Sequence, residues 1–404
     1  MTKYGTSPWV DEFPKARMPA YPRQRGSLNA DAVVIGGGLT GCATAYAFAA
    51  AGQRVVLLEA DRIGLGATAH ASGWIAEEPG VPFADLGRAV GARAARRAFQ
   101  VWRRAALDFA ALLRRLDIRC HLAAHPALTT AAGPEQAARL KRDQKARRDA
   151  GLDAVLLNAR AVRAETALDV DAALRAKDGF TLDPYRACVG LAASAAARGA
   201  QIFERTAVRK TRFGRRTADV FTAGGTIRTG RIVVATAMPT ALFRSLARHF
   251  WFHTTFFAAT ERLSAKIRQS LGRREAVVRD SAVPPHVVRW IDDRLLVSGA
   301  DGERVPERLR GKIVVQRTGQ LMYELSTLYP DISGVQPAYG WSADYARTAE
   351  GIPYIGAHRN YPHHLFAFGG ASRSVTGAYL ASRIFLRAHL GEPDPADDAF
   401  GFNR

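Results

Sequence analysis

The sequence has few of the residues on which several common chemistries depend. Its three cysteines, Cys42, Cys120 and Cys188, are too few for a disulfide framework, and no CxxC pair offers a zinc site. HExxH, GxSxG and P-loop motifs are absent, which disfavours metalloprotease, hydrolase and kinase functions, so we expect no metal. The first residues lack a charged segment followed by an apolar one. Together with the cysteine usage, this favours a cytoplasmic protein.

Long hydrophobic runs are also scarce. The longest uncharged stretch, between Asp31 and Arg54, would be long enough to cross a bilayer. It holds glycines at positions 36, 37, 38 and 41, however, and glycines crowded in this way favour a strand, a tight turn and a helix. We therefore expect no transmembrane segment.

Acidic residues are also few: the chain has 37 aspartates and glutamates and 57 lysines and arginines, which gives a net charge of +20. The cations are mostly arginine and are spread along the whole chain, a pattern typical of a biased genome composition. A basic protein attracts polyanions, so nucleic acid or an acidic membrane surface stays an alternative that we do not favour.

The most informative segment is residues 31–60, DAVVIGGGLTGCATAYAFAAAGQRVVLLEA. A short apolar strand runs directly into Gly36-x-Gly38-x-x-Gly41, a small-residue helix follows, and a second strand ends at Glu59. The three glycines serve a tight turn, a close approach of backbone to pyrophosphate, and close packing of helix on sheet. Glu59 can accept hydrogen bonds from a ribose. The segment predicts a dinucleotide site at the start of a helix.

The following segment favours FAD over a nicotinamide. Residues 64–74, GLGATAHASGW, are small and rich in hydroxyls, as suits a second loop laid along an extended cofactor. An NAD enzyme would usually continue into another βαβ unit at this point. His70 lies in this loop and could carry a covalent flavin, but we expect a non-covalent cofactor because a histidine there more often only forms hydrogen bonds.

These motifs resemble the D-amino-acid oxidase superfamily of FAD enzymes, which includes glycine oxidase, sarcosine oxidase and γ-glutamylputrescine oxidase. The likeness continues in LDPYR at 182–186, TAV at 206–208, GRIVVAT at 230–236, GIPYIG at 351–356 and FGGASRSVTG at 368–377. It spans about residues 30 to 390.

The resemblance implies an α/β protein in which a Rossmann-like FAD-binding domain is interleaved with a substrate domain built on an antiparallel sheet. After an N-terminal arm at 1–28, we assign 29–95, 180–248 and 336–404 to the FAD-binding domain. Residues 96–179 and 249–335 then form the substrate domain. The cofactor-binding residues implied by the glycine motif and the resemblance are Gly36, Gly38, Leu39, Thr40, Gly41, Glu59, Ala60, Ala67, Thr68, Ser72, Gly73, Trp74, Val208, Gly370, Arg373, Ser374, Val375 and Thr376.

The sequence departs from the family where the substrate is held. The resemblance implies an arginine for the substrate carboxylate near position 345, which is Tyr345 here. Arg347 follows two residues later, and we expect it to face away. His286 and Arg289, on an expected strand, are further candidates for substrate contact. The segment 294–299 has no lysine where the resemblance implies one that activates oxygen, so oxygen, a quinone or a protein remain open as electron acceptor.

The resemblance implies oxidation of an amine or amino acid C–N bond by hydride transfer to flavin N5, followed by hydrolysis of the imine. We expect slow turnover of glycine and D-alanine and faster turnover of a secondary or longer amine. A flavin dehydrogenase that reduces a quinone or protein, an FAD enzyme that acts on a tRNA side chain, and a flavin-binding subunit or sensor remain alternatives. The oligomeric state is left open.

Overall fold

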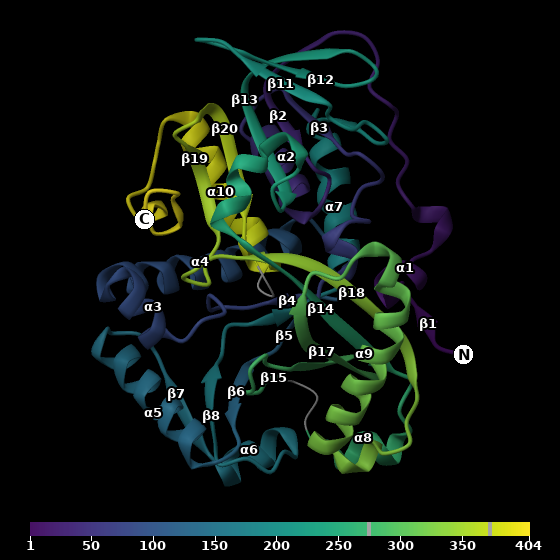
Figure 1. Ribbon diagram of the computed structural model, residues 1–404, viewed down its shortest axis with the longest axis vertical. Coiled ribbons are helices and arrows are strands. Elements are labelled where there is room, and N and C mark those ends of the chain that lie inside the picture. The colour runs from purple at the N-terminus through teal and green to yellow at the C-terminus, as the bar shows by residue number, and fades with distance from the viewer. Residues whose placement is uncertain (273–275, 371–373) are drawn as a thin grey trace.

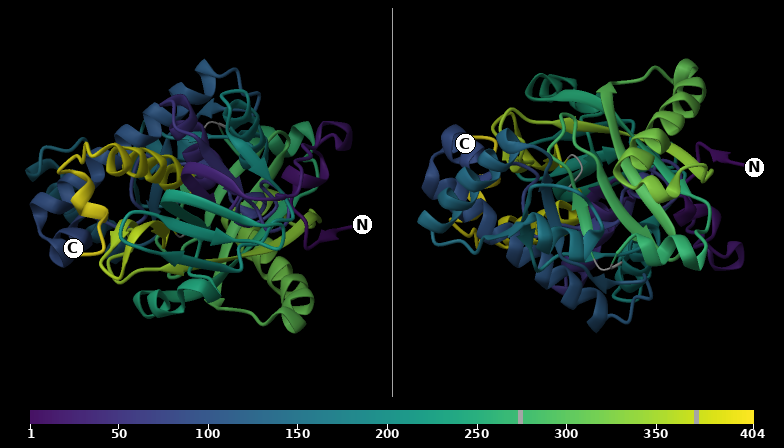
Figure 2. Two further views of the ribbon diagram at one scale, coloured as in Figure 1. Left: turned by 90° about the horizontal axis from the view of Figure 1, so that it is seen from above. Right: turned by 90° about the horizontal axis from the view of Figure 1, so that it is seen from below.

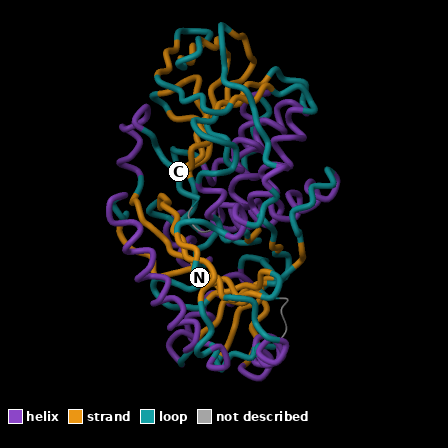
Figure 3. Tube along the Cα trace, turned by 90° about the vertical axis from the view of Figure 1, so that its right-hand side faces the viewer, coloured by secondary structure: helices purple, strands orange, loops and turns teal. Residues whose placement is uncertain are grey.

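Two sheets divide the molecule into an upper and a lower part in the computed structural model, which describes residues 1–272, 276–370 and 374–404 (Figure 1). In the side view of Figure 3 the strands form an upper and a lower group, with helices along the flanks. The two chain ends lie on opposite sides, as the views of Figure 2 also show.

The upper, eight-stranded sheet is a parallel core with antiparallel additions. Strands β10, β3, β2 and β13 run parallel, and β20 joins β13, also in parallel. Antiparallel strands β12 and β11 extend one end of β13, and β19 pairs with β20. The strands are β2 (Leu28–Ile35), β3 (Val55–Leu58), β10 (Gln201–Phe203), β11 (Lys210–Phe213), β12 (Ala218–Phe221), β13 (Thr226–Ala237), β19 (Tyr354–His358) and β20 (Tyr361–Phe368).

Three helices cover one face of this sheet: α2 (Leu39–Ala50), α7 (Pro184–Ala196) and α10 (Ser374–Leu390). Helix α2 consists largely of small residues and is buried on nearly all sides, which lets both other helices approach it closely. The long helix α4 (Ala92–Arg115) packs on α10 in the same core. Most of it, from residue 96 onward, was assigned to the substrate domain from the sequence, yet it packs with the helices of the upper part.

The lower sheet has nine strands in the order β1-β18-β14-β17-β16-β15-β6-β8-β7. Its pairs are mostly antiparallel, whereas β1–β18 and β15–β6 are parallel. The strands are β1 (Lys3–Tyr4), β6 (Ala127–Ala131), β7 (Val155–Asn158), β8 (Ala172–Ala176), β14 (Trp251–Thr260), β15 (Val277–Arg279), β16 (Val287–Ile291), β17 (Arg294–Glu303) and β18 (Pro337–Arg347).

Strand β18 differs from the domain boundaries drawn from the sequence. We assigned residues 336–404 to the FAD-binding domain, but β18 pairs along its length with β14 in the lower sheet. The arm at 1–28 is also structured, because its strand β1 pairs with β18 and its later residues bind the upper sheet, where the Gly26 amide donates to the Gly224 carbonyl.

Shorter elements complete the fold. A small sheet of β4 (Trp74–Ile75), β9 (Phe180–Thr181) and β5 (Ala123–Ala124) lies between the two larger ones. The remaining helices are α1 (Pro8–Asp11), α3 (Phe83–Val90), α5 (Pro134–Asp149), α6 (Ala159–Thr166), α8 (Ala265–Ser270) and α9 (Glu307–Leu328). The 3₁₀ segments are η1 (Lys15–Arg17), η2 (Ala67–His70), η3 (Ala241–His249), η4 (Pro330–Ile332) and η6 (Asp397–Phe400). Within the described residues, no helix is long and apolar enough to cross a membrane.

Candidate active site

The glycine-rich turn joins β2 to α2 in a geometry that only glycine allows at two positions. Gly36 has a φ of +107°, and a Cβ there would lie 2.7 Å from the Ala235 carbonyl oxygen. A Cβ on Gly41 would lie 1.8 Å from the Gly36 carbonyl oxygen, which forbids any side chain at that position. Helix α2 therefore starts directly above the strand end, with its free amides and positive dipole end at the turn.

Glu59, which directly follows β3, is held in place by the same turn. Its carboxylate accepts from the Gly37 amide at 2.6 Å and from the Asp61 amide at 2.8 Å. A carboxylate has about four lone-pair positions, so it keeps capacity for further donors. The structure thus brings the glycine turn and the acid into direct contact, as the dinucleotide hypothesis requires.

A cavity of about 480 Å³ opens along this turn. Its volume is in the range of small-molecule sites. The cofactor-binding residues predicted from the sequence that line it are Gly36, Gly38, Leu39, Thr40, Glu59, Ala60, Ala67, Thr68, Val208, Ser374 and Val375. These residues come from four separate segments of the chain, and the fold gathers them around one space.

A second cavity, of about 110 Å³, continues from the first and lies between the upper part and the lower sheet. The two share lining residues, including Thr40, Ala67 and Ser374. Of the other predicted residues, Ser72, Trp74, Gly370 and Tyr345 line the second cavity. Its walls are mostly apolar, and they include Phe257 and Val287 from the lower sheet.

Three predicted cofactor residues lie outside both linings, and a fourth is not described. Gly41 seats α2 on the turn. Gly73 packs against the Leu182 carbonyl oxygen, which a Cβ would approach to 2.2 Å. Thr376 Oγ1 donates to the Ala76 carbonyl at 2.8 Å, which ties α10 to the segment after β4. Arg373 lies outside the described residues.

Four carbonyls of the second loop accept hydrogen bonds from side chains remote in sequence. Ser7 Oγ donates to Ala69 at 2.5 Å, Trp341 Nε1 to His70 at 3.2 Å, and Trp9 Nε1 to Ala71 at 3.0 Å. The fourth donor is Arg289, whose Nη1 lies 3.2 Å from the Gly73 carbonyl. The N-terminal arm thus helps to fix the loop, a role that no sequence pattern in the arm indicated.

Arg289, a candidate for substrate contact, lies behind this loop and not in the cavity lining. It is 4% exposed, donates to the Leu182 carbonyl at 3.1 Å, and its guanidinium lies 5.2 Å from the Trp9 ring centroid. Burial lowers the pKa of Arg289 to about 9, so it stays charged at neutral pH. Its contacts are those of a residue that positions the loop.

His286 is likewise held away from the cavity. Its Nδ1 lies 2.6 Å from Asp280 Oδ2 and its Nε2 lies 2.9 Å from Glu324 Oε2. The hydrogen bond with Asp280 outweighs burial, and together with Glu324 it raises the pKa of His286 to about 9. The histidine joins the segment before β16 to α9.

Tyr345 does line the cavity, from β18. Its hydroxyl donates to Asp301 Oδ2, and its ring is stacked on His253 at 5.7 Å. Burial and the Asp301 carboxylate raise the pKa of Tyr345 above its usual value, so it stays protonated. The expectation that Arg347 faces away was wrong, because residues two apart on a strand share a face. Arg347 ends β18 on the same face as Tyr345.

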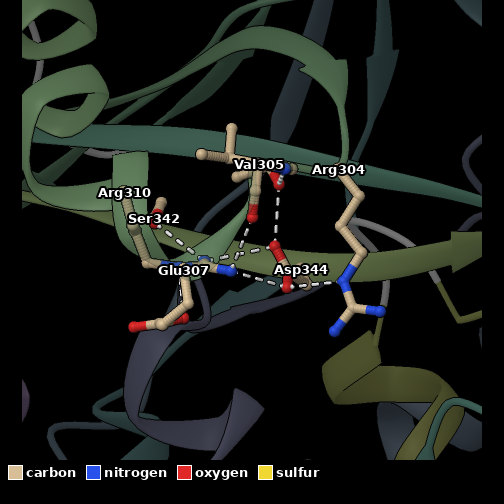
Figure 4. Close-up of polar contacts among 7 residues, drawn as sticks. Arg304, Val305, Glu307, Arg310, Ser342 and Asp344 are labelled. Carbon is tan, nitrogen blue, oxygen red and sulfur yellow. Dashed lines mark hydrogen bonds and ion pairs between the residues drawn. The ribbon is translucent and has the colours of Figure 1, made fainter.

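Asp344, beside Tyr345, also lines the cavity, and the sequence analysis missed it. Figure 4 shows its carboxylate between Arg304 and Arg310. It accepts from Arg310 at 2.8 Å, from Arg304 at 3.1 Å and from Thr254 Oγ1 at 2.7 Å. Burial opposes ionisation, but these donors together lower the pKa of Asp344. All its partners come from distant segments, so no local signal could have identified it.

The glycine turn, the acid at the next strand end and the second cavity, which faces a largely antiparallel sheet, define a dinucleotide-binding oxidoreductase with two interleaved parts. The sequence matches the DAO family, described as FAD dependent oxidoreductase, over residues 31–387, and the chain belongs to this family. Its cofactor is FAD, and the family resemblance inferred from the glycine motif and the second loop is confirmed.

The γ-glutamylputrescine oxidoreductase of Escherichia coli is 27% identical over 92% of this chain and 86% of its own length. The glycine oxidase of Bacillus licheniformis is 24% identical over 90% of this chain and 94% of its own. Among solved structures, glycine oxidase from Geobacillus kaustophilus superposes with a TM-score of 0.71 at 20% identity, covering 91% of this chain and 96% of that one. This last likeness concerns the fold.

Proposed function

We propose that the protein oxidises the C–N bond of an amine or amino acid, and that water then hydrolyses the imine. The observation that carries this proposal is the junction of the two cavities, because the dinucleotide cavity runs directly into a mostly apolar space between the upper part and the lower sheet. The names of the two relatives specify γ-glutamylputrescine and glycine, an amine and an amino acid. When bound, FAD supplies the hydride acceptor.

His70 is the residue of this lining suited to take a proton from the substrate ammonium. Its Nδ1 lies 3.0 Å from the Gly66 carbonyl, which can only accept, so the neutral ring carries its proton on Nδ1 and leaves Nε2 as an acceptor. Burial lowers the pKa of His70, which keeps the ring neutral at pH 7. The rate of flavin reduction should therefore fall at acidic pH, and in His70→Gln this fall at acidic pH should be absent.

The contacts of His70 also support a non-covalent cofactor, because its ring is engaged by Gly66. Acid precipitation of the yellow protein should release FAD into the supernatant. Colour that stays with the pellet would show a covalent link and would overturn this part of the proposal.

The test of the reaction is anaerobic mixing of the holoenzyme with glycine, D-alanine, sarcosine, D-proline and a polyamine at equal concentration, with glycolate as an amine-free control. Loss of flavin absorbance with at least one amine, and none with glycolate, is the expected result. Bleaching by glycolate alone would place the chemistry on C–O bonds. Bleaching by none of them would favour the flavin-binding subunit or sensor. Oxygen or a quinone added to the reduced enzyme then identifies the electron acceptor.

A further inference from the structure

Three hydroxyl side chains stand in a row on the face of the lower sheet that lines the second cavity: Ser298 of β17, Thr255 of β14 and Tyr345 of β18. Ser298 is paired with Phe257, which lies two residues from Thr255. Thr255 is in turn paired with Ala343, which lies two residues from Tyr345. Residues two apart on a strand, and residues directly paired between strands, share one face. The three hydroxyls therefore cross three neighbouring strands on one wall of the cavity.

Two of these hydroxyls have no partner in the protein. Tyr345 donates its hydroxyl proton to Asp301. Within the described part of the chain, neither Thr255 Oγ1 nor Ser298 Oγ forms a hydrogen bond, and both oxygens remain accessible from the cavity. A hydroxyl is both a donor and an acceptor, and in a mostly apolar wall it loses hydrogen bonds with water unless a ligand replaces them. Thr255 and Ser298 thus mark the place on this wall where a polar group can be bound.

The pairing of the strands is irregular at the same place. Strands β14 and β17 change register beside Thr255, where Ala300 and Asp301 of β17 oppose this one residue. Ala300 has a φ of +52°. Bulges of this kind re-aim side chains and are frequent next to active sites. Here the bulge lies in the wall of the cavity, and its Asp301 is the residue that holds the Tyr345 hydroxyl.

The charge on this wall is already compensated. Among the described lining residues there is no lysine or arginine, His70 is neutral, and Asp344 is the one carboxylate. The two oxygens of Asp344 accept from four donors, which occupy the roughly four lone-pair positions of a carboxylate (Figure 4). A charged group of a substrate at this wall would lose its water without meeting a free opposite charge. A neutral group that forms hydrogen bonds with the two hydroxyls avoids that cost.

We infer that Thr255 and Ser298 bind a neutral amide of the substrate in the second cavity. An amide suits two neighbouring hydroxyls because its carbonyl accepts, its N–H donates, and each hydroxyl can take either part. Diagonal neighbours on adjacent strands lie about 7–8 Å apart, so one amide can reach both hydroxyls. The substrate class is an amine that carries an amide in its chain. This inference rests on the proposed function for the oxidisable amine, but not for the amide.

The binding test uses N-butylacetamide, which has an amide and an apolar chain but no oxidisable amine. Butyl acetate, which lacks the N–H, and hexanoate, which is charged, are the comparison ligands. Calorimetry of the holoenzyme should show N-butylacetamide binding at least about threefold more tightly than either of them. Thr255→Val and Ser298→Ala should each weaken N-butylacetamide by roughly three- to tenfold, the loss expected for one hydrogen bond.

Thr129→Val is the matched control, because it makes the same change on β6 of the same sheet and Thr129 lines neither cavity. It should leave the affinity for N-butylacetamide unchanged. FAD content and melting temperature verify the folding of each variant. Ser298→Ala, which removes a single oxygen, keeps the test open if Thr255→Val does not fold.

The catalytic test compares N-(4-aminobutyl)acetamide with hexylamine by anaerobic flavin reduction. The wild type should reach half-saturation at a lower concentration of the amide, and the double variant should lose this preference through the half-saturation concentration rather than the limiting rate. Equal affinity of wild type and double variant for N-butylacetamide would overturn the inference, even if amines bleach the flavin and the proposed function stands. If N-butylacetamide binding depends on both hydroxyls but no amine bleaches the flavin, the amide subsite stands and the proposed function fails.

Discussion

Replacement of Glu59 tests the link between the glycine turn and cofactor affinity. The carboxylate accepts from two backbone amides, Gly37 and Asp61, at 2.6 and 2.8 Å. A hydrogen bond to a charged group is worth roughly 1.5–3 kcal/mol, and an amide left without its partner loses this contribution. Because Glu59 is partly exposed and water can replace part of each bond, we expect Glu59→Ala to lower the stability of the apoprotein by about 1–3 kcal/mol.

Glu59→Ala should lower FAD affinity by more than this loss of stability alone would produce. Glu59→Ala also removes the acceptor offered to a ribose, so FAD affinity should fall by roughly ten- to hundredfold, which corresponds to about 1.4–2.7 kcal/mol. Glu59→Gln keeps one acceptor oxygen, so its FAD affinity should lie between those of the wild type and the alanine variant. Titration of apoprotein with FAD, followed by quenching of flavin fluorescence, measures the affinity, and urea unfolding of the apoprotein measures the stability.

Asp61→Asn is the matched control, because its side chain is exposed and only its backbone amide binds Glu59. It should change neither quantity by more than about 0.5 kcal/mol, the usual range for a surface substitution. An FAD dissociation constant of Glu59→Ala within twofold of the wild type would refute this reasoning, since the acid would then only shape the turn.

Three further predictions concern the turn, the loop and pH. Gly41→Ala should abolish folding or FAD binding because its Cβ would lie 1.8 Å from the Gly36 carbonyl oxygen. Gly38→Ala should fold, since only Thr68 Oγ1 comes within 3.2 Å of its Cβ, and Gly38→Val should fold but bind FAD poorly. Circular dichroism measures the folding of each variant, and flavin content measures its FAD binding. Trp9→Phe leaves the Ala71 carbonyl without its donor, which should lower stability by about 1–3 kcal/mol and speed FAD release. An unchanged rate of FAD release would contradict the role of the N-terminal arm in fixing the second loop. The pKa of His286 is raised from 6.5 to about 9, so its ion pairs stabilise the fold fully below pH 6.5. This contribution, at most about 3 kcal/mol, is lost as the pH rises through 9. The free energies of unfolding of His286→Gln and the wild type, measured by denaturation across this range, should therefore converge at high pH.

The parts of the fold that follow from local chemistry were predictable. The strand, turn and helix around Gly36 and Gly41 follow from local geometry, because Gly36 takes a positive φ and Gly41 abuts the Gly36 carbonyl oxygen, and the acid at the strand end lies where the βαβ geometry puts it. The second loop was recognised from its small residues. In these segments neighbours in sequence are neighbours in space, so the pattern of residues is enough.

The remaining features depend on pairing between distant segments. The pairing of β18 with β14 places it in the lower sheet, although the sequence near Tyr345 resembles a stretch leading into the FAD domain. Arg289 and His286 carry chemistry that suits a substrate, but their partners are Gly73, Leu182, Asp280 and Glu324, which only the folded chain brings to them. A charged residue read from sequence has no partner until the tertiary structure supplies one.

The large positive charge of the chain also gains a meaning only from the tertiary structure. With 57 lysines and arginines against 37 acids, many cations must lack an acidic partner, so this lack alone indicates nothing. Exposed cations of this kind are hydrated and contribute little to binding or stability.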